Sequence, residues 1–227
     1  MLSVILPAHN EAEALAISLP ALVAQLPENA ELIVVCDRCS DATAEIARRY
    51  TELVFSITAG SAAAARNYGA EQAKGEMFLF LDADTVCSEN VPELVGQLAL
   101  GTGNSVYGTA PLQSDSGHWL GRFIAADINR FNRRHQSMGG NCFVAAGLFR
   151  AVDGFNTQLL RGEDTDLGVR CQRQGGQYVW LKGGHFVHNE RKFRTHGYVR
   201  YYCSLVLGGL LWQLSERLYA RSLGGQA

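Results

Sequence analysis

Three short apolar runs, each followed at once by polar residues, constrain the fold of this chain more than any other feature. The runs are Leu2–Leu6, Leu32–Val35 and Met77–Leu81. Continuous apolar runs of this length are typical of strands that are buried on both faces of a parallel sheet. Segments with helical patterns separate them, and this alternation predicts a parallel, doubly wound α/β sheet through about residue 90.

The polar residues that follow these runs are the first candidates for a binding site. In an open parallel sheet, ligands bind beyond the carboxyl ends of the strands. Pro7–Glu11, Asp37–Asp41 and Asp82–Asp84 all fall at such positions. We therefore expect three strands to deliver these side chains to one edge of the sheet.

The rest of the chain has a less regular pattern. It contains no internal repeat, low-complexity tract or linker, so we expect one continuous domain over residues 1–227. Along the whole chain, a first helix is expected to open at Asn10-Glu11, with apolar residues at helical spacing through Leu22. The further expected helices cover 42–50, 61–74, 119–134, a segment from 161–164 through Cys171, and 196–223. Strands are expected at 105–112 and 177–181, and 142–149 is a further apolar stretch.

Charge and cysteine content exclude some classes of protein. A net charge of -2 argues against a protein that binds nucleic acid by broad attraction to phosphates. The six cysteines lack the dense spacing of a secreted disulfide framework, which indicates reduced thiols and a cytoplasmic protein. Cys36 and Cys39 form a CxxC pair, but a zinc ribbon needs a second pair that the sequence lacks. Incidental thiols at a strand end are the simpler interpretation, and a redox or zinc role is the alternative.

Two segments bear on membranes. Residues 1–7 have no basic region and no long apolar core, so they are expected to form a strand rather than a signal peptide. The uncharged run 201–215 is short for a membrane span. We expect this run to pack on the domain, to build a homodimer, or to contact the inner face of a membrane peripherally. The last role is suggested by basic residues between positions 191 and 200.

Asp82 and Asp84 follow the most apolar run of the chain. Residues two apart on a strand point to the same face, and a turn at the strand end lets both carboxylates approach one centre. Mg²⁺ and Mn²⁺ prefer hard oxygen ligands and often share them with substrate phosphates. The pair therefore predicts a Mn²⁺ or Mg²⁺ site, with a solvated turn as the alternative. His188, or else His185, is a candidate to complete the metal shell.

Other charged side chains are candidates for neighbouring roles. Asp37 stands at a strand end, where a carboxylate accepts hydrogen bonds from a base or ribose. Arg66 lies in an alanine-rich helix and is either a phosphate ligand or a surface residue. Glu163 and Asp164 begin a helix, where each is a candidate general base. The helix dipole is the alternative reason for acidic residues there.

Taken in order, these motifs resemble those of family 2 glycosyltransferases. Each motif alone is weak, but their combined order is specific and covers most of the chain to about residue 195. The matching segments are Ile5–Glu11, Val35–Thr43, Ala65–Gly69, Phe80–Asp84, Gly154–Phe155 and Gly162–Asp166.

The resemblance implies a GT-A fold, a Rossmann-like sandwich with a mostly parallel central sheet and helices on both faces. Within the one expected domain, a nucleotide-sugar-binding half is expected at 1–90 and an acceptor half at 91–195, followed by a C-terminal helix at 196–227 that the helical pattern predicts. The resemblance also implies that a sugar passes, with inversion and metal dependence, from a nucleoside diphosphate sugar to an acceptor hydroxyl. A UDP-sugar is the favoured donor, and the acceptor is a glycan, a lipid-linked molecule or a small molecule.

The resemblance further implies residue roles. Asp84 would hold the metal, with Asp82 on the metal or the ribose, and Arg66 would meet the ribose or diphosphate. Asp164, next to Glu163, would deprotonate the acceptor. Two glycines, Gly139 and Gly140, would shape the acceptor side. The nucleotide pocket would be lined by Pro7, Ala8, Asn10, Glu11, Asp37, Arg66, Asp82 and Ala83.

The chain departs from the family pattern in the loops that would contact the base. Arg38-Cys39-Ser40 stands where many relatives have Gly-Ser-Thr, and His9 stands where relatives often carry an aromatic residue. The Gln-x-x-Arg-Trp motif of processive members is absent, which favours single additions. The alternative functions are a nucleotidyltransferase, which usually has a Gly-rich basic loop near the first strand, and a non-catalytic nucleotide-sugar-binding protein.

Overall fold

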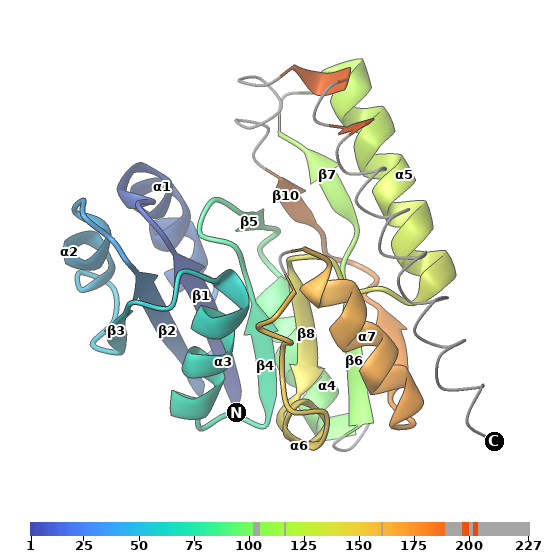
Figure 1. Cartoon of the computed structure of the whole chain (residues 1–227), viewed down its shortest axis with the longest axis horizontal. Coiled ribbons are helices and arrows are strands. Elements are labelled where there is room, and N and C mark those ends of the chain that lie inside the picture. The colour runs from blue at the N-terminus through green and yellow to red at the C-terminus, as the bar shows by residue number, and fades with distance from the viewer. Residues whose placement is uncertain (102–104, 116, 160, 189–196, 200–201, 204–227) are drawn as a thin grey trace.

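The computed structural model describes residues 1–101, 105–115, 117–159, 161–188, 197–199 and 202–203, and the side chains of Leu100 and His188 lie outside this description. The strands are β1 (Leu2–Ala8), β2 (Ala30–Asp37), β3 (Val54–Ile57), β4 (Met77–Phe80), β5 (Val86–Cys87), β6 (Val106–Thr109), β7 (Leu112–Ser114), β8 (Cys142–Ala145), β9 (Gln177–Trp180) and β10 (Phe186–His188). Within the described residues they form a seven-stranded sheet, in the order β3-β2-β1-β4-β8-β6-β9, and a three-stranded sheet, β5-β10-β7. Figure 1 shows the smaller sheet at one end of the larger one.

The N-terminal strands form the parallel part of the large sheet. β1 pairs in parallel with β2 on one side and β4 on the other, with Ile5 opposite both Ile33 and Phe80. Every residue of β1 and β4 is buried, as expected from their continuous apolar sequences. The carboxyl ends of these strands therefore share one edge of the sheet, and the predicted mostly parallel α/β sheet is confirmed.

Helices cover both faces of this sheet. The helices are α1 (Ala12–Val23), α2 (Thr43–Ala47), α3 (Ala62–Gln72), α4 (Val91–Gly101), α5 (Trp119–His135), α6 (Ala146–Ala151) and α7 (Glu163–Arg173). α3 packs on β1 and β2, and α4 packs on β4 and β1 from the far side in Figure 1. Gly69 lets α3 approach closely, because an added Cβ would lie 2.5 Å from the Ile5 Cγ2 atom.

The structure corrects several predicted boundaries. The single strand expected at 105–112 is divided between β6 and β7, which belong to different sheets, because the chain leaves the large sheet at Pro111. Proline lacks the N–H that a continuing ladder needs. The apolar stretch 142–149 comprises β8, antiparallel to β4, followed by α6. The helix expected at 42–50 ends at Ala47.

The small sheet was not expected from the sequence. Its strands have two or three residues each, too few for a period of two to be recognisable. α5 packs on β7, where the Asn129 side chain accepts a hydrogen bond from the Leu112 N–H at 2.8 Å and donates one to its carbonyl at 2.9 Å. This part of the domain is thereby built from very short strands that join distant segments and carry little sequence signal.

The expected C-terminal helix at 196–227, with its apolar run 201–215, lies outside the described residues except for 197–199 and 202–203. Among the residues that the structure does describe, no helix has the length and apolarity needed to cross a membrane.

One side chain links the two halves of the domain through backbone groups. The Asn67 amide, on α3, donates to the Phe155 carbonyl and accepts from the Phe155 N–H, both at 2.8 Å. We expect Asn67→Ala to lower the free energy of unfolding by roughly 2–4 kcal/mol, because two backbone groups lose their partners. Urea denaturation followed by circular dichroism measures the change. Gln72→Ala, at an exposed position of the same helix, is the control and should cost less than about 0.5 kcal/mol. Equal effects of the two substitutions would show that the link contributes nothing.

Candidate active site

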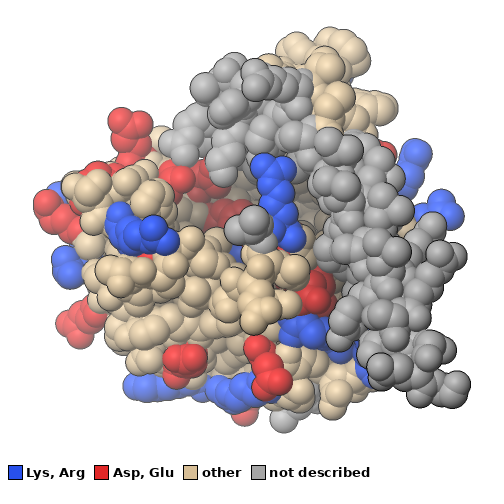
Figure 2. Space-filling model, in the orientation of Figure 1, with Lys and Arg blue, Asp and Glu red and all other residues tan. Residues whose placement is uncertain are grey.

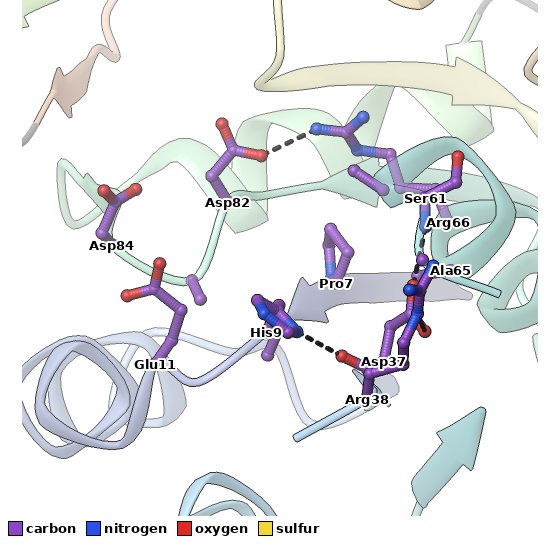
Figure 3. Close-up of a pocket in the computed structure, with 14 residues that line it drawn as sticks. Pro7, His9, Glu11, Asp37, Arg38, Ser61, Ala65, Arg66, Asp82 and Asp84 are labelled. Atoms are coloured by element: carbon purple, nitrogen blue, oxygen red, sulfur yellow. Dashed lines mark hydrogen bonds and ion pairs between the residues drawn. The ribbon is translucent and has the colours of Figure 1, made fainter. Parts of the chain in front are cut away.

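A cavity of about 520 Å³ opens where the parallel strands end. Its size lies within the range of small-molecule sites. Figure 2 shows acidic side chains inside a hollow of this face, and Figure 3 shows how the lining residues converge. The lining consists of Pro7, Ala8, His9, Glu11, Asp37, Arg38, Gly60, Ser61, Ala62, Ala65, Arg66, Asp82, Ala83 and Asp84.

Asp37, the last residue of β2, forms one end of the cavity. Its carboxylate is buried, and Oδ2 accepts a hydrogen bond from the Ser61 N–H at 2.8 Å. Its carbonyl oxygen lies 2.7 Å from the Nδ1 of His9. The second carboxylate oxygen, Oδ1, is buried and has no hydrogen-bond partner among the described residues. Leaving a buried acceptor unpaired costs free energy, so a ligand that donates a hydrogen bond to it would recover that free energy.

The loop after β1 is held by the loop after β2. Asn10 has a positive φ of 52°, and its side-chain oxygen accepts from the Ser40 N–H at 2.8 Å. The Glu11 N–H donates to the Thr43 hydroxyl at 2.9 Å. Of the residues predicted to bind the nucleotide here, Glu11 lines the cavity, whereas Asn10 is not among the lining residues. Asn10 shapes the loop instead.

Asp82 and Asp84 lie on a tight turn after β4. The Thr85 N–H donates to the Asp82 carbonyl at 2.9 Å, and the Asp82 N–H donates to the Asn141 side chain at 2.9 Å. The buried Ser18 hydroxyl donates to the Ala83 carbonyl at 2.8 Å. Both carboxylates line the cavity, and Figure 3 shows Asp84 close to Glu11 at the end away from Asp37.

Arg66 forms the centre of an ion-pair network. Its guanidinium is buried and contacts Asp82 Oδ1 at 2.7 Å and Glu163 Oε1 at 3.0 Å. Burial disfavours the charged form, but the two carboxylates outweigh it and raise the pKa of Arg66. Arg66 lines the cavity as predicted, while its hydrogen bonds go to protein carboxylates.

Glu163 and Asp164 open α7. Gly162 precedes them with a φ of 78° and offers no side-chain cap. The Asp164 Oδ1 atom accepts from the Thr165 N–H at 2.7 Å. Two effects raise the pKa of the Asp164 carboxyl above its usual range: removal from water is the larger, and the nearby charge of Glu163 is the second. Neither residue lines the cavity itself; Glu163 is joined to it through Arg66.

Asp166, two residues after Asp164 on α7, is held in an ion pair. Its carboxylate accepts a hydrogen bond from Arg170 Nε at 2.8 Å within the same helix, and the ion pair brings Nη2 to 2.7 Å from Oδ2. An ion pair of this kind supports the helix and leaves the carboxylate little capacity to act as a base.

The metal prediction rests on two carboxylates. The side chain of His188 lies outside the described residues, and the His185 N–H donates to the Ser88 hydroxyl at 3.0 Å. In the part of the chain that is described, no group of three His, Cys, Asp or Glu side chains is arranged to hold an ion. Mg²⁺ and similar ions are often held by one or two carboxylates together with substrate phosphates and water. Asp82 and Asp84 fit this second arrangement.

The contacts of Cys36 and Cys39 bear on whether the CxxC pair is reactive. The Cys39 thiol lies 3.4 Å from the Ala8 carbonyl oxygen, to which it donates, and 3.4 Å from the Asn10 amide nitrogen. Burial, followed by the neighbouring Cys39, raises the pKa of the Cys36 thiol to about 12. A buried thiol in this state is unreactive. The simpler interpretation of these cysteines therefore agrees with the structure.

Several lining residues were missed as ligand contacts. Ser61 and Gly60 follow β3, a weak strand whose half-buried residues gave no sign that its end belongs to the site. His9 and Arg38 were noticed only as departures from the family pattern. The missing signal was the parallel pairing of β3 with β2, since adjacent parallel strands end at one edge.

Comparisons with known proteins agree with this architecture. The sequence model of the glycosyl transferase family 2 matches residues 3–154. An uncharacterized glycosyltransferase of Rickettsia felis is 28% identical over 238 residues, which cover 95% of this chain and 39% of the relative. The amylovoran biosynthesis glycosyltransferase AmsB of Erwinia amylovora is 28% identical over 206 residues, 79% of this chain and 66% of the relative. The chain thus spans less than two thirds of the length of these relatives.

Solved structures share the fold. The mannosyltransferase PcManGT from Pyrobaculum calidifontis, in complex with GDP-Man and Mn²⁺, aligns with a TM-score of 0.70 at 17% identity, over 88% of this chain and 59% of the other. S. aureus TarS 1-349 in complex with UDP-GlcNAc aligns with a TM-score of 0.67 at 19% identity, over 83% and 59%. The fold is that of GT-A glycosyltransferases, and the extent of the family match shows that this chain belongs to glycosyl transferase family 2.

Proposed function

We propose that this chain transfers a sugar from a nucleoside diphosphate sugar, with uridine as the preferred nucleoside, to an acceptor hydroxyl. Transfer is metal-dependent, inverts the anomeric centre and adds one sugar at a time. The observation that carries the proposal is that Asp37 lines the cavity and that its buried Oδ1 has no hydrogen-bond partner among the described residues. The solved relatives with bound UDP-GlcNAc and GDP-Man support a nucleotide sugar as the ligand of this fold.

The chemistry of Asp37 favours uracil. Oδ2 is already bonded to the Ser61 N–H, so Oδ1 is left for one N–H donor. Uracil presents a single N–H between two carbonyl groups. Guanine presents a ring N–H beside an amino group, so one of the two carbonyl groups that flank the N–H in uracil is replaced by a second donor. One carboxylate oxygen without a hydrogen bond therefore suits the single N–H of uracil.

The opposite end of the cavity suits the diphosphate and a divalent cation. Asp84 is the stronger candidate ligand, because Asp82 Oδ1 is bonded to Arg66. When bound, Mn²⁺ or Mg²⁺ would neutralise the charge that develops on the diphosphate leaving group. The carboxylates of Asp82 and Glu163 keep the Arg66 guanidinium charged, because they raise its pKa. Arg66 in turn holds Asp82, which lines the cavity.

Asp164 is proposed as the general base. Its pKa is raised by removal from water and by Glu163, which makes the carboxylate a better proton acceptor than an exposed one. It would take the proton of the acceptor hydroxyl as that oxygen attacks the anomeric carbon. Because attack and departure of the diphosphate occur on opposite faces in one displacement, the configuration inverts.

The alternatives make different products. A nucleotidyltransferase releases pyrophosphate, a binding protein releases nothing, and a glycosyltransferase releases a nucleoside diphosphate. Incubation of the protein with radiolabelled UDP-sugars and Mn²⁺ tests this directly. Release of UDP supports the proposal, and bound but intact donor under all acceptor conditions would contradict it.

Removal of the metal ligand tests the acidic end of the cavity. We expect Asp84→Ala to lower metal-dependent UDP release by about 100-fold or more, since the charge of the leaving group is then poorly compensated. EDTA should abolish turnover of the unmodified protein, and added Mn²⁺ should restore it. Glu89→Gln, an exposed carboxylate just beyond the turn, is the control and should behave normally. Full activity in EDTA would refute metal dependence.

Replacement of the base should separate activity from stability. Asp164→Asn keeps an oxygen for the Thr165 N–H but cannot accept the acceptor proton, so transfer should fall by about 100-fold or more while donor binding persists. A carboxyl whose pKa is higher in the folded chain than in the unfolded chain destabilises the fold above its unfolded pKa. Asp164→Asn should therefore raise the melting temperature near neutral pH but not below the unfolded pKa. Normal transfer by this variant would exclude Asp164 as the base.

The pH dependence of transfer tests the role of Glu163. Its charge raises the pKa of Asp164, so Glu163→Gln should lower that pKa. Asp164 must be ionised to act, and the acidic limb of the kcat/KM profile should move to lower pH. Glu45→Gln, in an exposed ion pair on α2, is the control and should leave the profile in place. A shift in the opposite direction would rule out this coupling.

A further inference from the structure

Arg38, the residue after Asp37, has an unusual backbone conformation. Its φ is 52°, in the left-handed region that bulky residues rarely adopt. The backbone is held there by the Arg38 N–H, which donates to the Ile57 carbonyl at 3.0 Å. Strain of this kind concentrates at ligand-binding positions. Asp37 and Arg38 together therefore call for a functional explanation.

Gly60 provides the space for the Arg38 side chain. An added Cβ at Gly60 would lie 0.9 Å from the Arg38 Nη2 atom and 1.9 Å from Cζ. The guanidinium thus occupies the volume that any other residue at position 60 would fill. It lines the cavity there, with its Nε 3.9 Å from Asp37 Oδ1.

This arrangement sets hydrogen-bond donors beside a free acceptor. Asp37 Oδ1 is the acceptor, and the planar guanidinium of Arg38 presents its donors in a fixed fork. The edge of uracil has the complementary pattern, an N–H flanked by carbonyl oxygens. Figure 3 shows Asp37 and Arg38 at one end of the cavity and Glu11 and Asp84 at the other, which separates this pair from the acidic end.

We infer that Arg38 is a specificity-determining residue that donates a hydrogen bond to a uracil carbonyl while Asp37 accepts from the adjacent N–H. The inference rests on the proposed function, because it assigns the base of the donor. Gly60 is the positioning residue that leaves room for the guanidinium. Adenine, cytosine and guanine each carry an amino group whose second hydrogen finds no acceptor in this pair.

Binding measurements with free nucleotides test the inference without turnover. Arg38→Gly is the sharpest variant, since glycine adopts a φ of 52° without strain and the fold should not lose stability. Isothermal titration with UDP, GDP and inorganic pyrophosphate, each with Mn²⁺, measures the effect. We expect UDP affinity to fall about tenfold, as for loss of one charge-assisted hydrogen bond, and GDP and pyrophosphate affinity to fall much less. Arg49→Ala is the control, because it removes an exposed positive charge just after α2 from a residue that does not line the cavity. It should change none of these affinities.

A second substitution links the effect to geometry. Gly60→Ala should reduce UDP affinity in the unmodified protein, because the methyl group displaces the guanidinium. In the Arg38→Gly background the same change should cost less UDP affinity, since the space is then empty. Equal costs in both backgrounds would assign the effect to strain at the positive φ of Gly60 and overturn its positioning role.

The outcomes distinguish the inference from the proposed function. If Arg38→Gly leaves the ratio of UDP affinity to GDP affinity unchanged, or weakens pyrophosphate as much as UDP, Arg38 does not contact the base and the inference is wrong. If the unmodified protein prefers GDP but still cleaves its sugar donor, the inference fails and the proposed transferase activity stands. If it binds no nucleoside diphosphate and cleaves no donor, the proposed function fails as well.

Discussion

The buried guanidinium of Arg66 is the interaction on which the rest of the site depends. It joins the turn after β4 to the start of α7 through Asp82 and Glu163, which are 16 and 97 residues away in the sequence. A buried charge costs several kcal/mol unless it is paired. The folded state is therefore stabilised when both carboxylates reach Arg66, and these contacts hold the segments that carry the neighbouring Asp84 and Asp164. Arg66 thus links the segment of the proposed metal ligand to the segment of the proposed general base.

This network needs a rigid support, which the apolar strands supply. β1 and β4 are buried throughout, and α3 lies directly on β1 and β2 because Gly69 allows close contact. Arg66 and Asn67 are consecutive on that helix, so the helix is tied to the second half by an ion pair and by two backbone hydrogen bonds. The loops that carry polar residues are short and bonded to one another, as in the Glu11–Thr43 contact.

The sequence predicted best what depends on local pattern. The continuous apolar runs identified β1, β2 and β4, and the polar residues after them fell at one edge because parallel strands end together. Pairings between distant segments left no such pattern. The ion pair of Arg66 with Glu163, the contact of Gly60 with Arg38 and the three-residue strands β7 and β10 become visible only once the chain is folded. Asn10 was assigned to the pocket for its motif, whereas its side chain organises the loop.

Features that oppose folding collect around the cavity. Of the four non-glycine residues with positive φ in the described chain, Gln136 and Asp153 end helices, whereas Asn10 and Arg38 end β1 and β2 beside the site. Asp37 Oδ1 is buried there without a hydrogen-bond partner among the described residues, and burial raises the pKa of Asp164. A ligand that bonds to Asp37 would recover free energy that the fold alone forgoes, so part of its affinity is already stored in the unliganded protein. The proposed activity therefore depends on groups that lower the stability of the fold, and the buried strands and the Arg66 network offset that cost.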